Sequence, residues 1–151
     1  MQESELRRKL RERQESAKLA EIGRELSGLF TGRALVEGEM PAWVRETEWG
    51  FWDMSAEPAA VLSDEEAPAV VDAWIESLLA QHGITGTVFV SSHLSGYPWI
   101  ECDAPSSGWV TGIRKVLADP WVFVNSALDL VVSVTEGEHY YQAHVGRRPE
   151  S

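Results

Sequence analysis

The chain has 151 residues, 44% of them apolar, and a formal net charge of −11 at pH 7, which suits one domain with a hydrophobic core. Its apolar runs are far shorter than the roughly 20 residues that cross a bilayer, which excludes a membrane-spanning protein. A single cysteine, Cys102, excludes an internal disulfide framework, and the charged N-terminal residues lack the apolar segment of a secretory signal. We therefore expect a cytoplasmic protein.

The charge is distributed unevenly along the chain. Residues 1–33 carry eight Lys/Arg and six Asp/Glu, a net charge of +2, whereas residues 34–113 carry Arg45 against thirteen acids, a net charge of −12. Residues 114–151 carry four bases and five acids, a net charge of −1. An acidic body repels the phosphates of nucleic acids and attracts basic proteins or cations. Solubility alone explains the same charge equally simply.

The N-terminal segment has the composition of a helix, but its apolar residues change phase. At roughly 100° per residue, one side collects Leu6, Leu10, Ala17 and Ala20, and nearly the opposite side collects Leu19, Ile22, Leu26, Leu29 and Phe30. We expect a charged helical arm over residues 1–15, and a single α+β domain over residues 16–151. This domain begins with a helix over 17–30 that Ser16 caps. The basic run "LRRKLRER" is interleaved with glutamates, as in a solvated helix face.

Residues 34–62 contain several Gly and Pro residues and are expected to be irregular, with one or two short strands. Three of the seven tryptophans, Trp43, Trp49 and Trp52, lie here among acids. One explanation is that this segment folds back as a lid over the sheet. The alternative is a binding face, because tryptophan is enriched at interface hot spots and flanking acids would steer a basic partner.

The remaining elements follow from their periodicity. Residues 63–82 predict an amphipathic helix with a capping box at Ser63 and Glu66, with Asp72 on its solvent side. Residues 87–92 and 97–101 predict strands, and residues 106–119 predict a further helix. The segment from Trp121 onward predicts three more strands. This order favours an α+β fold with a mostly antiparallel sheet of about four to six strands, packed against two or three helices.

The last two strands predict a hairpin whose turn is centred on Glu136 and Gly137. Alternation fixes which residues share a face, and this register places Asp129 opposite His144 as an ion pair on the polar face. Ser133 lies four residues from Asp129, which is roughly 13 Å along a strand and too far for a catalytic triad.

No motif fixes an enzymatic chemistry. Cys102 lies between Glu101 and Asp103, whose charges disfavour a reactive thiolate. No nucleotide-binding or hydrolase motif is present, and His139 and His144 are five residues apart, on opposite faces of one strand. We therefore predict no catalytic residue, no metal site and no cofactor.

The leading hypothesis is a small acidic protein-binding module that engages a basic protein and neither a nucleic acid nor a membrane. A toxin-neutralising immunity protein is its most concrete instance, because toxins that cleave nucleic acids have basic clefts. One alternative is an adaptor or assembly protein that forms oligomers through its N-terminal helices, and another is an enzyme of unknown chemistry. The predicted partner-binding residues are Trp43, Glu46, Glu48, Trp49, Trp52 and Asp53.

Overall fold

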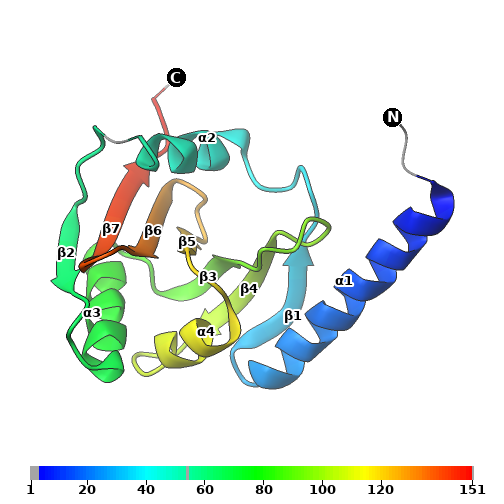
Figure 1. Ribbon diagram of the computed structural model, residues 1–151, viewed down its shortest axis with the longest axis horizontal. Helices are drawn as coiled ribbons and strands as arrows, with labels where there is room; N and C mark the ends of the chain where they lie inside the picture. The colour runs from blue at the N-terminus through cyan, green and yellow to red at the C-terminus, as the bar shows by residue number, and fades with distance from the viewer. Residues whose placement is uncertain (1–3, 54, 151) are drawn as a thin grey trace.

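The computed structural model describes residues 4–53 and 55–150, which form the α+β fold that the sequence predicts. The described helices are α1 (Glu5–Glu25), α2 (Ala42–Phe51), α3 (Pro68–Gln81) and α4 (Val110–Val116). The described strands are β1 (Phe30–Leu35), β2 (Ala60–Ser63), β3 (Gly86–Ser91), β4 (Trp99–Ala104), β5 (Trp121–Asn125), β6 (Leu130–Glu136) and β7 (Tyr140–Arg147). They pair antiparallel in one seven-stranded sheet of order β1-β4-β3-β5-β6-β7-β2 (Figure 1).

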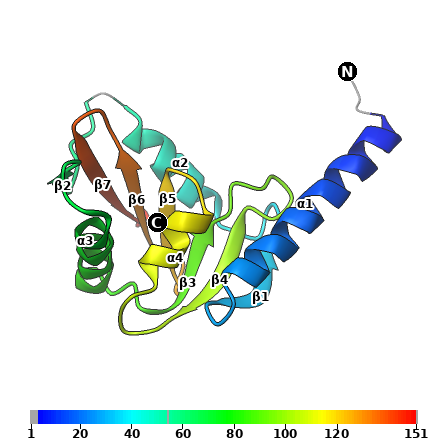
Figure 2. The ribbon, with the colours of Figure 1, turned by 60° about the horizontal axis from the view of Figure 1, so that its bottom comes forward.

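Helices cover both faces of this sheet. The C-terminal part of α1 packs with α3 and α4 on one face, and α2 packs on the other (Figure 2). Successive residues of the central strands enter the two cores in turn. Val88 and Val90 of β3 face α3 and α4, whereas Phe89 between them faces α2. A strand segment that is buried on both faces is apolar at successive positions, as residues 88–90 of β3 and 121–124 of β5 are.

The helix α2 was not predicted, because residues 34–62 were expected to be irregular. Its buried side is narrow: Val44 is fully buried and Phe51, seven residues later, is half-buried. Two apolar positions among acids and a glycine give a weak helical period. The helix approaches the sheet closely because β7 has a glycine, Gly146, where any side chain would overlap Thr47 and Phe51.

The N-terminal segment forms one continuous helix, so the separate helix over 17–30 with Ser16 as its cap is wrong. Ser4 caps α1, its Oγ accepting a hydrogen bond of 3.2 Å from the Arg7 amide. Only the C-terminal part of α1 packs on the sheet, through Ile22, and the N-terminal part extends away from the body (Figure 1, Figure 2). The change of apolar phase marks the point where the helix leaves the protein surface, and the helix itself continues.

The β6–β7 hairpin has the predicted faces but a different register. Ser133 pairs with His144, whereas Asp129 was expected opposite this histidine, so the true register is shifted by four residues. An even shift leaves every side chain on its predicted face, and alternation therefore cannot detect it. The observed register places Val132 opposite Val145, which brings apolar residues together within the core.

Asp72 of α3 was expected on the solvent side but is buried, with a relative exposure of 6%. The helix also starts later than predicted, at Pro68, so the capping box at residues 63–66 does not form. The Asp72 carboxylate forms an ion pair of 2.5 Å with Arg114 of α4 and accepts a hydrogen bond from Thr111. The Arg114 guanidinium also lies 4.9 Å from the centre of the Trp121 ring. This buried pair joins α3 to α4 and holds both helices on the sheet.

Arg114→Met should lower the free energy of unfolding by about 3–5 kcal/mol, because it leaves the buried carboxylate of Asp72 without its partner. Urea denaturation measures the change. Lys115→Met is the matched control, since Lys115 is the neighbouring exposed cation and should change stability by less than about 0.5 kcal/mol. A loss below about 1 kcal/mol for Arg114→Met would show that the pair is not important for stability.

Candidate functional site

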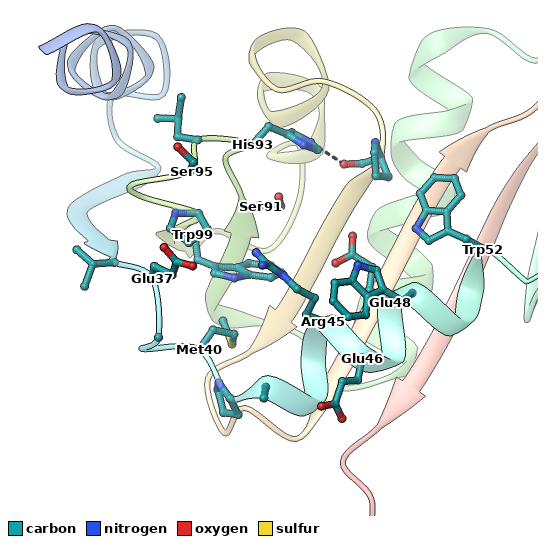
Figure 3. Close-up of a pocket in the computed structure, with 18 residues that line it drawn as sticks. Glu37, Met40, Arg45, Glu46, Glu48, Trp52, Ser91, His93, Ser95 and Trp99 are labelled. Atoms are coloured by element: carbon teal, nitrogen blue, oxygen red, sulfur yellow. Dashed lines mark hydrogen bonds between the residues drawn. The ribbon is translucent and has the colours of Figure 1, made fainter. Parts of the chain in front are cut away.

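A pocket of about 680 Å³ lies between α2, the segment that precedes it, and the loop that joins β3 to β4. Figure 3 shows Arg45 and Glu48 extending into it from α2. Ser91, His93 and Trp99 line the opposite wall, which the end of β3, the β3–β4 loop and the start of β4 provide. This volume falls within the range of roughly 300–1,000 Å³ that is usual for ligand-binding pockets.

The structure brings four of the six predicted partner-binding residues to this pocket: Glu46, Glu48, Trp49 and Trp52. Trp43 and Asp53 do not line it. Trp43 packs against the core under α2, and its indole Nε1–H donates a hydrogen bond of 3.2 Å to the Leu128 carbonyl. Asp53 borders a second, smaller pocket of about 270 Å³ instead. Its Oδ1 accepts hydrogen bonds from the amide and hydroxyl of Ser55, which lower the pKa of Asp53.

Trp49 and Trp52 are exposed at the pocket rim, with relative exposures of 64% and 58%. The lid interpretation is therefore wrong for these two residues, whereas Trp43 does pack against the core. Trp49 lies near the end of α2 and Trp52 follows its last residue, where the helix turns both indoles outward. Two neighbouring indoles that are left in water on one face are a feature that needs an explanation other than core packing.

Glu48 is half-buried in the wall of the pocket, whereas the other two acids of the lining, Glu37 and Glu46, are exposed. Burial raises the pKa of Glu48, and the positive charges of His93 and Arg45 lower it only in part. His93 acts on a second carboxyl group as well: burial raises the pKa of Asp119, while a hydrogen bond from the Glu136 amide and the charge of His93 lower it in part. The wall of the pocket therefore contains a half-buried carboxyl group, that of Glu48, whose loss of hydration the neighbouring cations offset only in part.

His93 is positioned by its backbone and by two carbonyl groups. Its φ of 64° lies in the left-handed region, which is uncommon for a residue with a side chain. The ring Nε2 lies 2.7 Å from the Ala118 carbonyl and 2.9 Å from the Pro120 carbonyl. Both oxygens are acceptors, so Nε2 must carry a proton and donate it to them. Figure 3 shows the contact with the Pro120 carbonyl.

The β3–β4 loop, which forms one wall of the pocket, is held by α1. The Glu15 carboxylate accepts hydrogen bonds from the Ser95 amide at 2.9 Å, the Ser95 hydroxyl at 2.7 Å and the Gly96 amide at 2.7 Å. Burial, the largest single influence, raises the pKa of Glu15, but these bonds and the charge of Arg11 outweigh it and leave the pKa below its usual value. Glu15 thus fixes a wall that it does not itself line.

Two serine hydroxyls in the segment around His93 have hydrogen-bond partners other than its ring. The hydroxyl of Ser95, which lines the pocket, donates to Glu15, and the hydroxyl of Ser92 donates to the Tyr97 carbonyl. Neither of these hydroxyls bonds to His93, so the nucleophile–base arrangement of acyl transfer does not form between them. Sequence reasoning identified Glu48 and the two exposed tryptophans but missed His93, Trp99 and Glu15, because nothing in their spacing brings them near α2.

The other candidate groups identified in the sequence lie apart from this pocket. Cys102 is fully buried, and this burial together with the charge of Glu101 raises its pKa to about 12, so it is not a nucleophile. The predicted ion pair of Asp129 with His144 is wrong: Asp129 accepts a hydrogen bond from Asn125, and His144 stacks on Phe51 with ring centroids 5.2 Å apart. Within residues 4–53 and 55–150, no three His, Cys, Asp or Glu side chains could together hold a metal ion.

None of the described helices combines the length and the apolarity that crossing a bilayer requires. No model of a known protein family, no curated protein and no solved structure matches this chain. Its function is therefore inferred from the site itself.

Trp49→Ala and Trp52→Ala should each change the free energy of unfolding by less than about 0.5 kcal/mol, because both indoles are already largely in water. Trp99→Ala is the matched control in the same pocket. Trp99 is only 7% exposed, so its truncation should lower stability by about 3–5 kcal/mol. Urea denaturation of the three variants measures both effects. Equal losses would mean that the rim indoles pack as Trp99 does.

His144 should make folding sensitive to mild acid. Burial lowers the pKa of His144 below 6.5, and a backbone hydrogen bond with Ala56 offsets this in part. The unfolded chain then binds more protons than the folded one, so this contribution to stability is present above pH 6.5 and is lost as the pH falls below it. His144→Phe keeps a ring against Phe51 and should flatten the pH dependence of urea unfolding below pH 6.5. An unchanged slope would contradict the assignment.

Proposed function

We propose that this chain is a small acidic protein-binding module that engages a basic protein through the outer face of α2. The observation that carries the proposal is the exposure of Trp49 and Trp52, 64% and 58%, beside Glu46 and Glu48. Tryptophan buries a large area while losing little conformational freedom, which is why it dominates binding hot spots. A surface that binds no partner gains no stability from two neighbouring indoles that are exposed to water.

The charge of the chain supports a basic partner. The net charge is −11, and residues 34–113, which contain α2, carry −12. Such a field attracts a cationic protein over a distance of about one Debye length, roughly 8 Å at physiological salt, and repels nucleic acid. The acids near α2 would therefore accelerate association, and the indoles would provide the energy that slows dissociation.

A toxin-neutralising immunity protein is the most concrete form of this proposal. An enzyme that cleaves nucleic acid needs a basic cleft for its phosphate substrate, and an acidic protein of this size can cover such a cleft. The free, buried thiol of Cys102 is consistent with residence in the cytoplasm, where such neutralisation would occur.

The test is a quantitative comparison of variants against the partner that the wild-type chain captures from its host. Trp49→Ala and Trp52→Ala should each weaken binding by at least about 2 kcal/mol, or roughly 30-fold, as expected for hot spots. Tyr140→Ala is the matched control, since Tyr140 is an aromatic residue with 52% exposure that lies away from the pocket on β7. Calorimetry or biosensor titration provides the affinities. Equal binding by all three variants would refute the proposed face.

A second candidate function rests on the exposed leucines of α1. Leu6 and Leu10, with relative exposures of 69% and 49%, lie one turn apart on the part of the helix that extends from the body (Figure 2). An apolar edge of this kind suits an adaptor or a self-assembling protein. Light scattering measures the oligomeric state of the wild type and of the double variant Leu6→Ser/Leu10→Ser. A wild-type oligomer that becomes a monomer in the variant would favour this function. A monomeric wild type would show that the chain does not assemble with itself.

A further inference from the structure

We infer that the pocket at α2 receives an arginine side chain of the basic partner, with its guanidinium group against Glu48 and the indoles of the rim. The inference rests on the proposed function and goes further, because it names the group that is bound and the place where it binds. It follows from the charge, the aromatic lining and the rigidity of the pocket.

The lining has an unbalanced negative charge. Among the described lining residues, Glu37, Glu46 and Glu48 are acids and Arg45 is the one arginine or lysine, so the acids outnumber these cations by two (three minus one). Glu48 is the most desolvated of these acids, and no cation lies within 4 Å of it among the described residues. A carboxylate that has already lost water gains more from an incoming cation than a fully hydrated one does.

Three indoles line the same pocket as Glu48. Trp49 and Trp52 are exposed at the rim, and Trp99 is 7% exposed in the opposite wall. A cation over the face of an indole is attracted by the ring quadrupole, an interaction that is stronger where water is excluded. The guanidinium group of arginine is planar and weakly hydrated, so it can stack on an indole and donate two hydrogen bonds to one carboxylate. The ammonium group of lysine is a compact, strongly hydrated charge and satisfies only part of this environment.

The pocket is large enough for this ligand and has one fixed wall. Its volume of about 680 Å³ leaves room for a long side chain beside Arg45. The β3–β4 loop that forms the wall is held by three hydrogen bonds to the Glu15 carboxylate. Both carbonyl contacts of His93 fix the same loop to the segment before β5. A wall that is ordered before binding lowers the entropy lost on binding.

The experiment titrates the chain with N-acetyl-arginine methylamide and with the matched lysine compound, at the same ionic strength. The ¹H–¹⁵N signals of the indole Nε1–H groups, assigned with single Trp→Phe variants, report on the site. The arginine compound should shift the signals of Trp49 and Trp52 saturably, and the lysine compound should bind at least several-fold more weakly. Glu48→Gln should weaken binding of the arginine compound on the order of tenfold, the scale for a lost charge-assisted hydrogen bond.

Two controls make the outcome decisive. Glu66→Gln removes one exposed acid outside the pocket, with the same change in net charge, and should bind as the wild type does. Trp52→Ala tests the same site if Glu48→Gln does not fold, and should also weaken binding. No saturable shift, equal binding of the two compounds, or equal binding by Glu48→Gln and Glu66→Gln would each overturn the inference.

The results also separate this inference from the proposed function. If a basic partner binds through Trp49 and Trp52 while the arginine compound leaves the pocket signals unchanged, the partner uses the rim alone and only the inference fails. If the arginine compound binds at Glu48 while Trp49→Ala and Trp52→Ala retain full affinity for the captured partner, only the proposed face fails.

Discussion

The central strands β3 and β5 carry large apolar side chains on both of their faces, and each of these faces must be shielded from water. Phe89 and Phe123 illustrate the requirement, because they lie on neighbouring strands yet point into opposite cores. One layer of helices shields only one face of the sheet from water. The position of α2, on the face opposite α3 and α4, follows from this requirement, and the pocket follows from the position of α2.

The helix α2 therefore serves two environments at once. Val44 and Phe51 on its inner side complete the second core, and Gly146 of β7 lets the helix approach closely enough to do so. Trp49 and Trp52 on the other side are then directed toward solvent. A short helix can keep two exposed indoles in place only if its inner face is firmly held, and here the stacking of Phe51 on His144 adds to the apolar contacts.

Sequence patterns predicted the elements with strong periodicity and failed where burial depended on distant residues. The sequence predicted the α+β class, a helix within residues 63–82 and the faces of the last hairpin, because each has a sustained apolar period, although the helix begins only at Pro68. The register of that hairpin was not, since the pattern is unchanged by an even shift. Asp72 was predicted to face solvent because its partner, Arg114, lies forty-two residues away and no local pattern indicates that the two residues pair.

The candidate site was predictable only in part, for the same reason. One short segment contains Glu48, Trp49 and Trp52, so these residues could be predicted as a group. The opposite wall comes from residues 91–99, and the Glu15 carboxylate that holds this wall comes from α1. A continuous apolar run such as Trp121–Val124 is the one signal that could have revealed a helix on the second face. Such a run indicates that both faces of the strand are buried, but it does not indicate which segment of the chain covers each face.

The clamp formed by Glu15 connects α1 to one wall of the pocket. One rigid helix carries, on its extending half, the exposed Leu6 and Leu10 and, in its middle, the carboxylate that holds the β3–β4 loop. A molecule that bound the extending half and displaced the helix would release that loop and so alter the affinity of the pocket. Reciprocity then requires that occupation of the pocket change the affinity of α1 for its own ligand by the same factor, so the two surfaces would behave as coupled sites.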